Sequence, residues 1–197
     1  MNIHDLSFPE FVKQVIEALE EAGVGYMIGG ALAVWAWGEP RSTMDLDLVV
    51  DLPYEAIGAL SRELKSRGMW VPEDIIRDNL LEDRADLAIN AIHPTSGLKA
   101  ELYPLREGDA LRRSAFERRR VADLGPELGI AYVHSPEDLI IYKLLYFSLS
   151  QQSKHPRDIL SILHSRQADL DLEYIQVWVD RLDLNSIWKD LWAEAQS

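Results

Sequence analysis

Two aspartates, Asp45 and Asp47, alternate with leucines in the apolar run at residues 44–50. On a β-strand, residues two apart point to the same face, so both carboxylates would share one face while the leucines enter the core. Two like charges about 7 Å apart repel by about 2 kcal/mol at an effective dielectric near 20. A divalent cation turns this repulsion into a ligand set, and Mg²⁺ prefers carboxylates together with water and phosphate oxygens. The alternative is an edge strand with acids on its solvent face.

Two consecutive glycines, Gly29 and Gly30, lie between a strand expected at residues 24–28 and a helix expected at residues 31–37. Glycine lets the backbone turn sharply and approach a ligand closely. The helix that follows offers free N–H groups and the positive end of its dipole to a phosphate. The alternative is an ordinary strand-to-helix turn.

Arg41 and Thr43 lie just before the two aspartates. The planar fork of Arg41 suits a β- or γ-phosphate, but it equally suits a carboxylate that anchors the loop, such as Glu39. Thr43 shares a face with Asp45 and Asp47 if the strand begins early. Both residues are therefore candidates for nucleotide binding.

The glycine pair and the Asp-x-Asp strand together resemble the signature of the nucleotidyltransferase superfamily. Its members include DNA polymerase β, poly(A) and CCA-adding polymerases and aminoglycoside nucleotidyltransferases. That signature is a hydrophobic strand, Gly-Gly or Gly-Ser, a short helix, and an Asp-x-Asp or Asp-x-Glu strand, which Ile28-Gly29-Gly30 and Asp45-Leu46-Asp47 match in order. The whole run at residues 29–47 is similar to a small bacterial and archaeal branch, in which some relatives are toxins of toxin–antitoxin pairs.

The resemblance implies a third carboxylate on a neighbouring strand. Alternation at residues 98–105 puts Lys99, Glu101 and Tyr103 on one face, so Glu101 is the candidate, although the family usually has Asp there. Asp86, on a preceding strand expected at residues 85–92, is the fallback. We therefore expect Asp45, Asp47 and Glu101 to be the catalytic, metal-binding residues.

The activity that the resemblance implies is transfer of a nucleoside monophosphate from an NTP to a hydroxyl, with two Mg²⁺ ions and with pyrophosphate leaving. The acceptor is a protein, a tRNA end or a small molecule. Gly29 and Gly30 would hold the triphosphate through their backbone. The alternative function is a non-catalytic relative that binds a nucleotide or a partner, such as an antitoxin or regulatory protein, which the glutamate at position 101 favours.

The C-terminal part of the sequence holds a second group of polar residues. In the resembled branch, a lysine in a Ser-Pro-Glu-Asp-Leu helix and a later basic-x-Arg-Asp segment recur, and Lys143 and His155-Pro156-Arg157-Asp158 match them. Lys143 would reach the nucleotide, with Asp158 positioning Lys143 or Arg157. The alternative for Lys143 is a surface lysine whose stem covers apolar area.

The order of elements predicts an α/β (α+β) fold in which helices flank a mixed β-sheet. Helical periodicity follows a capping box at Ser7 and Glu10, strand patterns recur up to residue 133, and Ser135 begins a strong helix. We expect a nucleotidyltransferase-like α/β core at residues 1–125 and a helical part at residues 126–197 packed on it.

The composition bounds the class of protein. The chain has 197 residues, a net charge of −13 and no cysteine, which excludes disulfides and thiolate metal sites and fits a cytoplasmic protein. The most apolar stretch, residues 26–37, is too short to span a bilayer, so we expect no membrane association. The arginines at residues 112–120 form either a solvated helix face and strand start or a contact surface for phosphate or RNA.

Overall fold

The computed structural model describes residues 6–82 and 84–196, over which six strands form one mixed sheet in the order β3-β4-β2-β1-β6-β5. The strands are β1 (Gly25–Ile28), β2 (Asp45–Asp51), β3 (Ile89–Ile92), β4 (Lys99–Pro104), β5 (Arg120–Asp123) and β6 (Ile130–Val133). The central strands β2 and β4 are parallel, as are β1 and β6, whereas the other neighbours are antiparallel. The predicted α/β class with a mixed sheet is confirmed.

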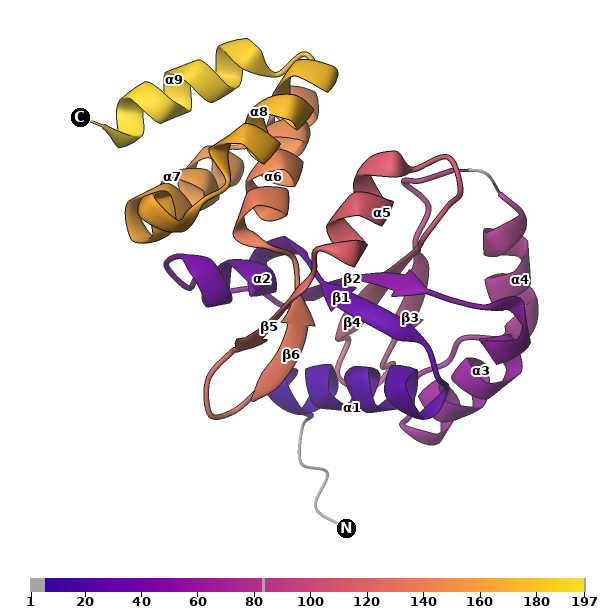
Figure 1. Ribbon diagram of the computed structural model, residues 1–197. Coiled ribbons are helices and arrows are strands. Elements are labelled where there is room, and N and C mark those ends of the chain that lie inside the picture. The colour runs from indigo at the N-terminus through magenta and orange to yellow at the C-terminus, as the bar shows by residue number, and fades with distance from the viewer. Residues whose placement is uncertain (1–5, 83, 197) are drawn as a thin grey trace.

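The helices lie in two groups. The helices are α1 (Phe8–Glu21), α2 (Gly30–Trp37), α3 (Ile57–Ser66), α4 (Glu73–Leu81), α5 (Ala110–Glu117), α6 (Pro136–Ser150), α7 (Lys154–Arg166), α8 (Leu172–Arg181) and α9 (Asn185–Ala195), with short 3₁₀ turns at Tyr54–Ala56 and Gln167–Asp169. Figure 1 shows α1 and α3 on one side of the sheet, α5 on the other, and α6–α9 gathered beside α2. Helices α6 and α7 contact α2, so the helical group packs against the element that follows Gly29.

Local sequence signals explain where the principal helices begin. The Ser7 side chain accepts a hydrogen bond from the backbone N–H of Glu10, whose carboxylate accepts one from the backbone N–H of Ser7, and this is the expected capping box. Ser135 caps α6 in the same way, through the backbone N–H of Asp138. These caps fix the residues at which α1 and α6 begin.

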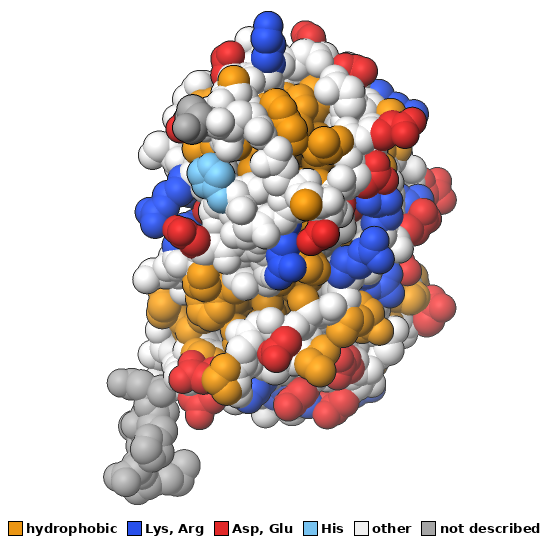
Figure 2. Space-filling view, turned by 60° about the vertical axis from the view of Figure 1, so that its left-hand side comes forward, with side chains coloured by type: hydrophobic (Ala, Val, Ile, Leu, Met, Phe, Trp, Pro, Cys, Tyr) orange, Lys and Arg blue, Asp and Glu red, His pale blue; other side chains and the backbone are white. Residues whose placement is uncertain are grey.

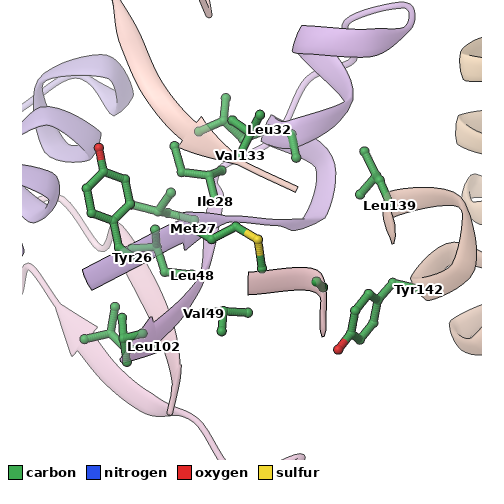
Figure 3. Packing of buried hydrophobic residues seen from close by; sticks show 14 of the residues in the cluster. Tyr26, Met27, Ile28, Leu32, Leu48, Val49, Leu102, Val133, Leu139 and Tyr142 are labelled. Atoms are coloured by element: carbon green, nitrogen blue, oxygen red, sulfur yellow. The ribbon is translucent and has the colours of Figure 1, made fainter. Parts of the chain in front are cut away.

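Apolar side chains from both helical groups meet the sheet in one core. Ile28 and Leu48 are fully buried in the paired strands β1 and β2. Figure 3 shows them near Leu102 and Val133, with Leu139 and Tyr142 extending from α6 toward the same strands. The sheet also continues past residue 125, because β6 pairs with β1 near its centre. The domain boundary after residue 125 stays a prediction.

Candidate functional site

The carboxylates of Asp45 and Asp47 line one cavity of about 860 Å³. In strand β2, Asp45 is exposed and Asp47 half-buried, while the intervening Leu46 and the following Leu48 are fully buried. The alternation of side chains along the strand therefore presents both acids to the cavity, as the spacing predicts. The same cavity is lined by Gly29, Gly30 and side chains from α5, α6 and α7.

The glycine turn lies directly against Asp47. The backbone N–H of Gly29 donates a 2.8 Å hydrogen bond to the carbonyl oxygen of Asp47. Gly30 has a φ of +57°, in the left-handed region that favours glycine, and a Cβ there would lie 1.8 Å from Oδ2 of Asp47. Glycine is thus required at this second position for two reasons: the backbone there is left-handed, and the carboxylate beside it leaves no room for a Cβ.

The ionisation of Asp47 reflects this crowded position. Burial raises the pKa of Asp47 above its usual range, and the negative charges of Glu101 and Asp45 raise it further. The positive charges of Lys143 and Lys154 lower it, but they do not outweigh the burial and the neighbouring acids. A cation between Asp45 and Asp47 would offset this repulsion.

Glu101 lies opposite Asp47 in the parallel register of β2 and β4. Its carboxylate accepts hydrogen bonds from Lys99 Nζ at 2.5 Å and from Tyr103 Oη at 2.7 Å. Burial raises the pKa of Glu101, but these two hydrogen bonds outweigh burial and leave its pKa below the usual value. The carboxylate is thus held by its own strand, although its position beside Asp47 is the one expected from the sequence.

The donor set fits a metal only in part. Within residues 6–82 and 84–196, no three His, Asp or Glu side chains are grouped so that they could hold an ion together. Two carboxylates on one face still suit Mg²⁺, because this ion takes its remaining ligands from water and substrate phosphates. The residues present therefore fit a cation that arrives with a nucleotide. The expected third ligand, Glu101, stays a prediction.

Asp86 does not lie on a strand. The strand expected at residues 85–92 is shorter and begins at Ile89, and Asp86 lies in the exposed turn before it, paired with Arg84 at 2.9 Å. Asp86 lines the cavity from this turn. The alternation argument that made it the fallback carboxylate therefore does not apply.

Arg41 and Lys143 share one buried carboxylate. Arg41 donates to both oxygens of Asp158 at 2.9 and 3.2 Å, and Lys143 Nζ donates to Oδ2 at 2.7 Å. Arg41 thus anchors its loop to α7, rather than to Glu39. Lys143 is only 3% exposed, which rules out the alternative of a surface lysine. Asp158 positions Lys143, as the sequence suggests.

Opposing effects set the charges of this group. Burial lowers the pKa of Lys143, while Asp158 raises it. Burial also raises the pKa of Asp158, but Arg41 and Lys143 outweigh it and bring the pKa of that carboxyl below its usual value. Arg41 and Lys143 line the same cavity as Asp47, and the charge of Lys143 acts on the Asp47 carboxylate.

Thr43 precedes the strand rather than belonging to it. Its hydroxyl is 3.3 Å from both the backbone N–H and the carbonyl oxygen of Asp45. Thr43 lines the cavity, so it remains a candidate for nucleotide binding. Its observed contact holds the start of β2 in place.

His134 is a cavity residue to which the sequence assigns no role. Its ring is buried beneath the glycine turn, where a Cβ on Gly29 would lie 3.1 Å from it. Burial lowers the pKa of His134 to about 4, and Nδ1 lies 3.3 Å from the carbonyl oxygen of Ile28. The lowered pKa favours the neutral ring, and the carbonyl oxygen of Ile28, which can only accept, assigns its proton to Nδ1. Tyr142 and Tyr146 also line the cavity and were not singled out, because nothing local distinguishes them from packing residues. Lys154 lines it as well; it belongs to the group of polar residues in the C-terminal part of the sequence, which by itself gives Lys154 no role.

The arginines at residues 112–120 are mostly used within the fold. Arg112 is 6% exposed and donates to the carbonyl oxygen of Ala85 at 2.7 Å. The guanidinium of Arg118 lies 3.8 Å from the ring centroid of Tyr174, and that of Arg119 covers Phe116. These three side chains therefore form neither a solvated helix face nor a phosphate-binding surface. On the face shown in Figure 2, basic side chains lie in separate groups among acidic and apolar ones.

Solved structures share the fold of this chain. No family model matches the chain, and no curated protein is detectably similar in sequence. The solution structure of the antibiotic-resistance factor ANT(2'')-Ia aligns over 98% of both chains with a TM-score of 0.61 at 18% identity. Its crystal structure with adenylyl-2''-tobramycin aligns over 91% of this chain and 98% of that one, with a TM-score of 0.59 at 17% identity.

A third similar structure is an antigenic nucleotidyltransferase-like protein from Paracoccidioides brasiliensis. It aligns over 96% of this chain and 92% of that one, with a TM-score of 0.56 at 16% identity. The chain has the nucleotidyltransferase fold. In this nucleotidyltransferase fold, the strand, glycine turn, helix and Asp-x-Asp strand of the sequence signature occupy β1, Gly29-Gly30, α2 and β2. In the described ranges, none of the helices combines the length and apolar character that crossing a membrane needs.

Proposed function

We propose that this protein transfers a nucleoside monophosphate from an NTP to an acceptor hydroxyl, with a divalent metal held by Asp45 and Asp47. The observation that carries the proposal is the packing of the Asp47 carboxylate against the start of α2, with Asp45 on the same face of β2. A triphosphate at the glycine turn would thus lie within reach of both carboxylates. Magnesium, when bound, would neutralise charge on the phosphates and stabilise the entering and leaving oxygens.

The residues of the chain would bind and orient the nucleotide. Backbone N–H groups at the start of α2 face the phosphates, because glycine at position 30 leaves no side chain in the way. Arg41 and Lys143, fixed by Asp158, would present positive charge to the same phosphates. Thr43 lies at the edge of this site.

In the proposed reaction, the acceptor oxygen bonds to the α-phosphorus, and the bond from that phosphorus to the bridging oxygen breaks. Pyrophosphate leaves with the electron pair of the broken bond. The hydroxyl proton passes to a carboxylate, for which Glu101 is the candidate because it lies opposite Asp47. The hydrogen bonds from Lys99 and Tyr103 would hold this carboxylate in position.

The acceptor is proposed as a hydroxyl of a protein, a tRNA end or a small molecule. The crystal structure of ANT(2'')-Ia holds an adenylylated small molecule, which favours a small acceptor for the shared fold. The chain is acidic, with a net charge of −13, which disfavours a long nucleic acid. A cytoplasmic location and a toxin–antitoxin partner stay predictions.

A second candidate function is nucleotide binding without transfer, in a regulatory or antitoxin protein. It is favoured by the engagement of Glu101 with Lys99 and Tyr103, since within residues 6–82 and 84–196 no third acid groups with Asp45 and Asp47 to hold an ion. This candidate predicts magnesium-dependent binding of an NTP and no release of pyrophosphate.

The test is incubation with each α-³²P-labelled NTP and Mg²⁺, with and without cell lysate. Label on protein, RNA or a small molecule identifies the acceptor. Asp45→Asn and Asp47→Asn should abolish labelling, whereas Asp51→Asn, at the exposed far end of the same strand, should not. Transfer that survives in Asp47→Asn would refute the metal assignment, and binding without labelling in the wild type would favour the second candidate.

A further inference from the structure

The cavity beside Asp47 has an uneven distribution of charge. Asp45 and Asp47 line it from β2, and Asp109 lines it from the start of α5. On the α5 side, Arg106 and Arg112 also line the cavity, but Arg106 donates to the carbonyl oxygens of Asn79 and Leu80, and Arg112 pairs with Asp109 and donates to the carbonyl oxygen of Ala85. On the other side, formed by the loop before β2 and by α6 and α7, lie Arg41, Lys143 and Lys154. A polyanion bound in the cavity would therefore extend toward α6 and α7.

Two of these cations are already committed to a partner. Arg41 and Lys143 both donate to Asp158, which is 2% exposed, so this buried carboxylate holds both side chains in place. One carboxylate against two cations leaves this trio with a single net positive charge. The trio can contribute a fixed positive potential, but some of its hydrogen-bond donors already bind Asp158.

Lys154 differs from both of them. It is the first residue of α7, it is exposed, and it forms no salt bridge within the described ranges of the chain. Its charge nevertheless acts on Asp47, whose pKa it lowers. A lysine ammonium is a compact charge on a flexible stem, so it can follow a phosphate group as the group binds.

We propose that Lys154 binds the β- and γ-phosphates of the nucleotide, so that the triphosphate tail lies against the start of α7. This inference rests on the proposed function, which puts the α-phosphate beside Asp45 and Asp47. The tail must then continue toward positive charge, and Lys154 is a cavity cation that is free of a salt bridge to the described residues. In a chain with a net charge of −13, such a local cation would weigh heavily in binding an anion.

The same helix supplies a matched control. Arg157 follows Lys154 by three residues and is also an exposed cation. It lines a different hollow, together with Glu39, Ser161 and His164, and not the cavity beside Asp47. The variants Lys154→Ala and Arg157→Ala therefore remove the same charge from the same helix at two different sites.

The test measures the affinity of each variant for ATP, AMP and inorganic tripolyphosphate by calorimetry, in the presence of Mg²⁺. Lys154→Ala should weaken binding of ATP and tripolyphosphate about tenfold or more, as expected for loss of a hydrogen bond to a charged group. Binding of AMP should not change, because AMP lacks the β- and γ-phosphates. Arg157→Ala should bind all three probes like the wild type, and Lys154→Arg should retain most of the affinity.

Equal ATP affinity in Lys154→Ala and wild type would overturn the inference, as would an equal loss for AMP and ATP. Thermal unfolding of each variant checks that the fold is kept. Failure of the proposed function has a different signature, because the wild-type protein would then bind ATP without releasing pyrophosphate, or would bind no nucleotide at all. The binding of tripolyphosphate to Lys154→Ala and to the wild type would still test the role of Lys154 in that case.

Discussion

Gly30→Ala should separate the geometry of the site from the stability of the fold. The new Cβ would lie 1.8 Å from Oδ2 of Asp47, whereas real Cβ contacts are essentially never shorter than 3.0 Å. The carboxylate must therefore withdraw by at least the difference between these distances, 1.2 Å. Mg²⁺ binds oxygen at about 2.0–2.1 Å in a strict octahedron, so a displacement of this size removes Asp47 from the ligand set.

The substitution should change two measurable quantities, the metal affinity and the melting temperature. Metal affinity should fall by at least about 10–100-fold, the range found when the support of a metal ligand is removed. The alanine must also adopt a left-handed φ of +57°, which costs roughly 1–2 kcal/mol of folding free energy. At about 2–4 °C per kcal/mol for a chain of this length, the melting temperature should fall by about 2–8 °C.

Gly23→Ala is the matched control. Gly23 has a φ of +70°, but a Cβ there has no atom within 4 Å, so this variant should show the loss of stability without the loss of metal affinity. Mn²⁺, titrated by electron paramagnetic resonance, reports the metal affinity without knowledge of the acceptor, and calorimetry gives the melting temperatures. Wild-type Mn²⁺ affinity in Gly30→Ala would refute the reasoning, because it would show that Asp47 can leave the glycine turn without consequence.

Three further substitutions test the charges of the site. Asp47→Asn should melt at the same or a higher temperature than wild type at pH 7 without metal, because the raised pKa of Asp47 means that its ionised form destabilises the fold above that pKa; a lower melting temperature would contradict this. Asp158→Asn should lower the free energy of unfolding by about 3–5 kcal/mol in denaturant titrations at pH 7, since Arg41 and Lys143 lose a shared buried partner. Because the pKa of Asp158 is lowered, this difference should be present above about pH 4 and shrink as the pH falls through the folded pKa, and a difference that persists in acid would argue against the ion pairs as its cause. Glu101→Gln should slow turnover more than it weakens nucleotide affinity, and unchanged kinetics would assign the proton acceptor to another group.

The sequence alone was sufficient to predict the strands and helices that carry the glycine pair and the Asp-x-Asp motif. Alternation of apolar and acidic residues at 45–51 predicts both the strand and the shared face of its two acids, because the side-chain period of a strand is a local property of the backbone. Capping residues likewise predict the start of α1 and of α6. The sequence did not indicate α4, and it placed Asp86 on a strand, because a short amphipathic helix and a polar turn give weak periodic signals.

Only the tertiary structure decided which polar side chains are partners. Arg41 and Asp158 are 117 residues apart in the chain, and no local pattern specifies that they meet. Their contact depends on how α6 and α7 pack against α2, which also buries Lys143 and leaves Lys154 open to the cavity. The sequence thus determined which residues share a face of each element. The packing of those elements determined which charges are paired within the fold and which remain available to a ligand, since burial makes an unpaired charge costly.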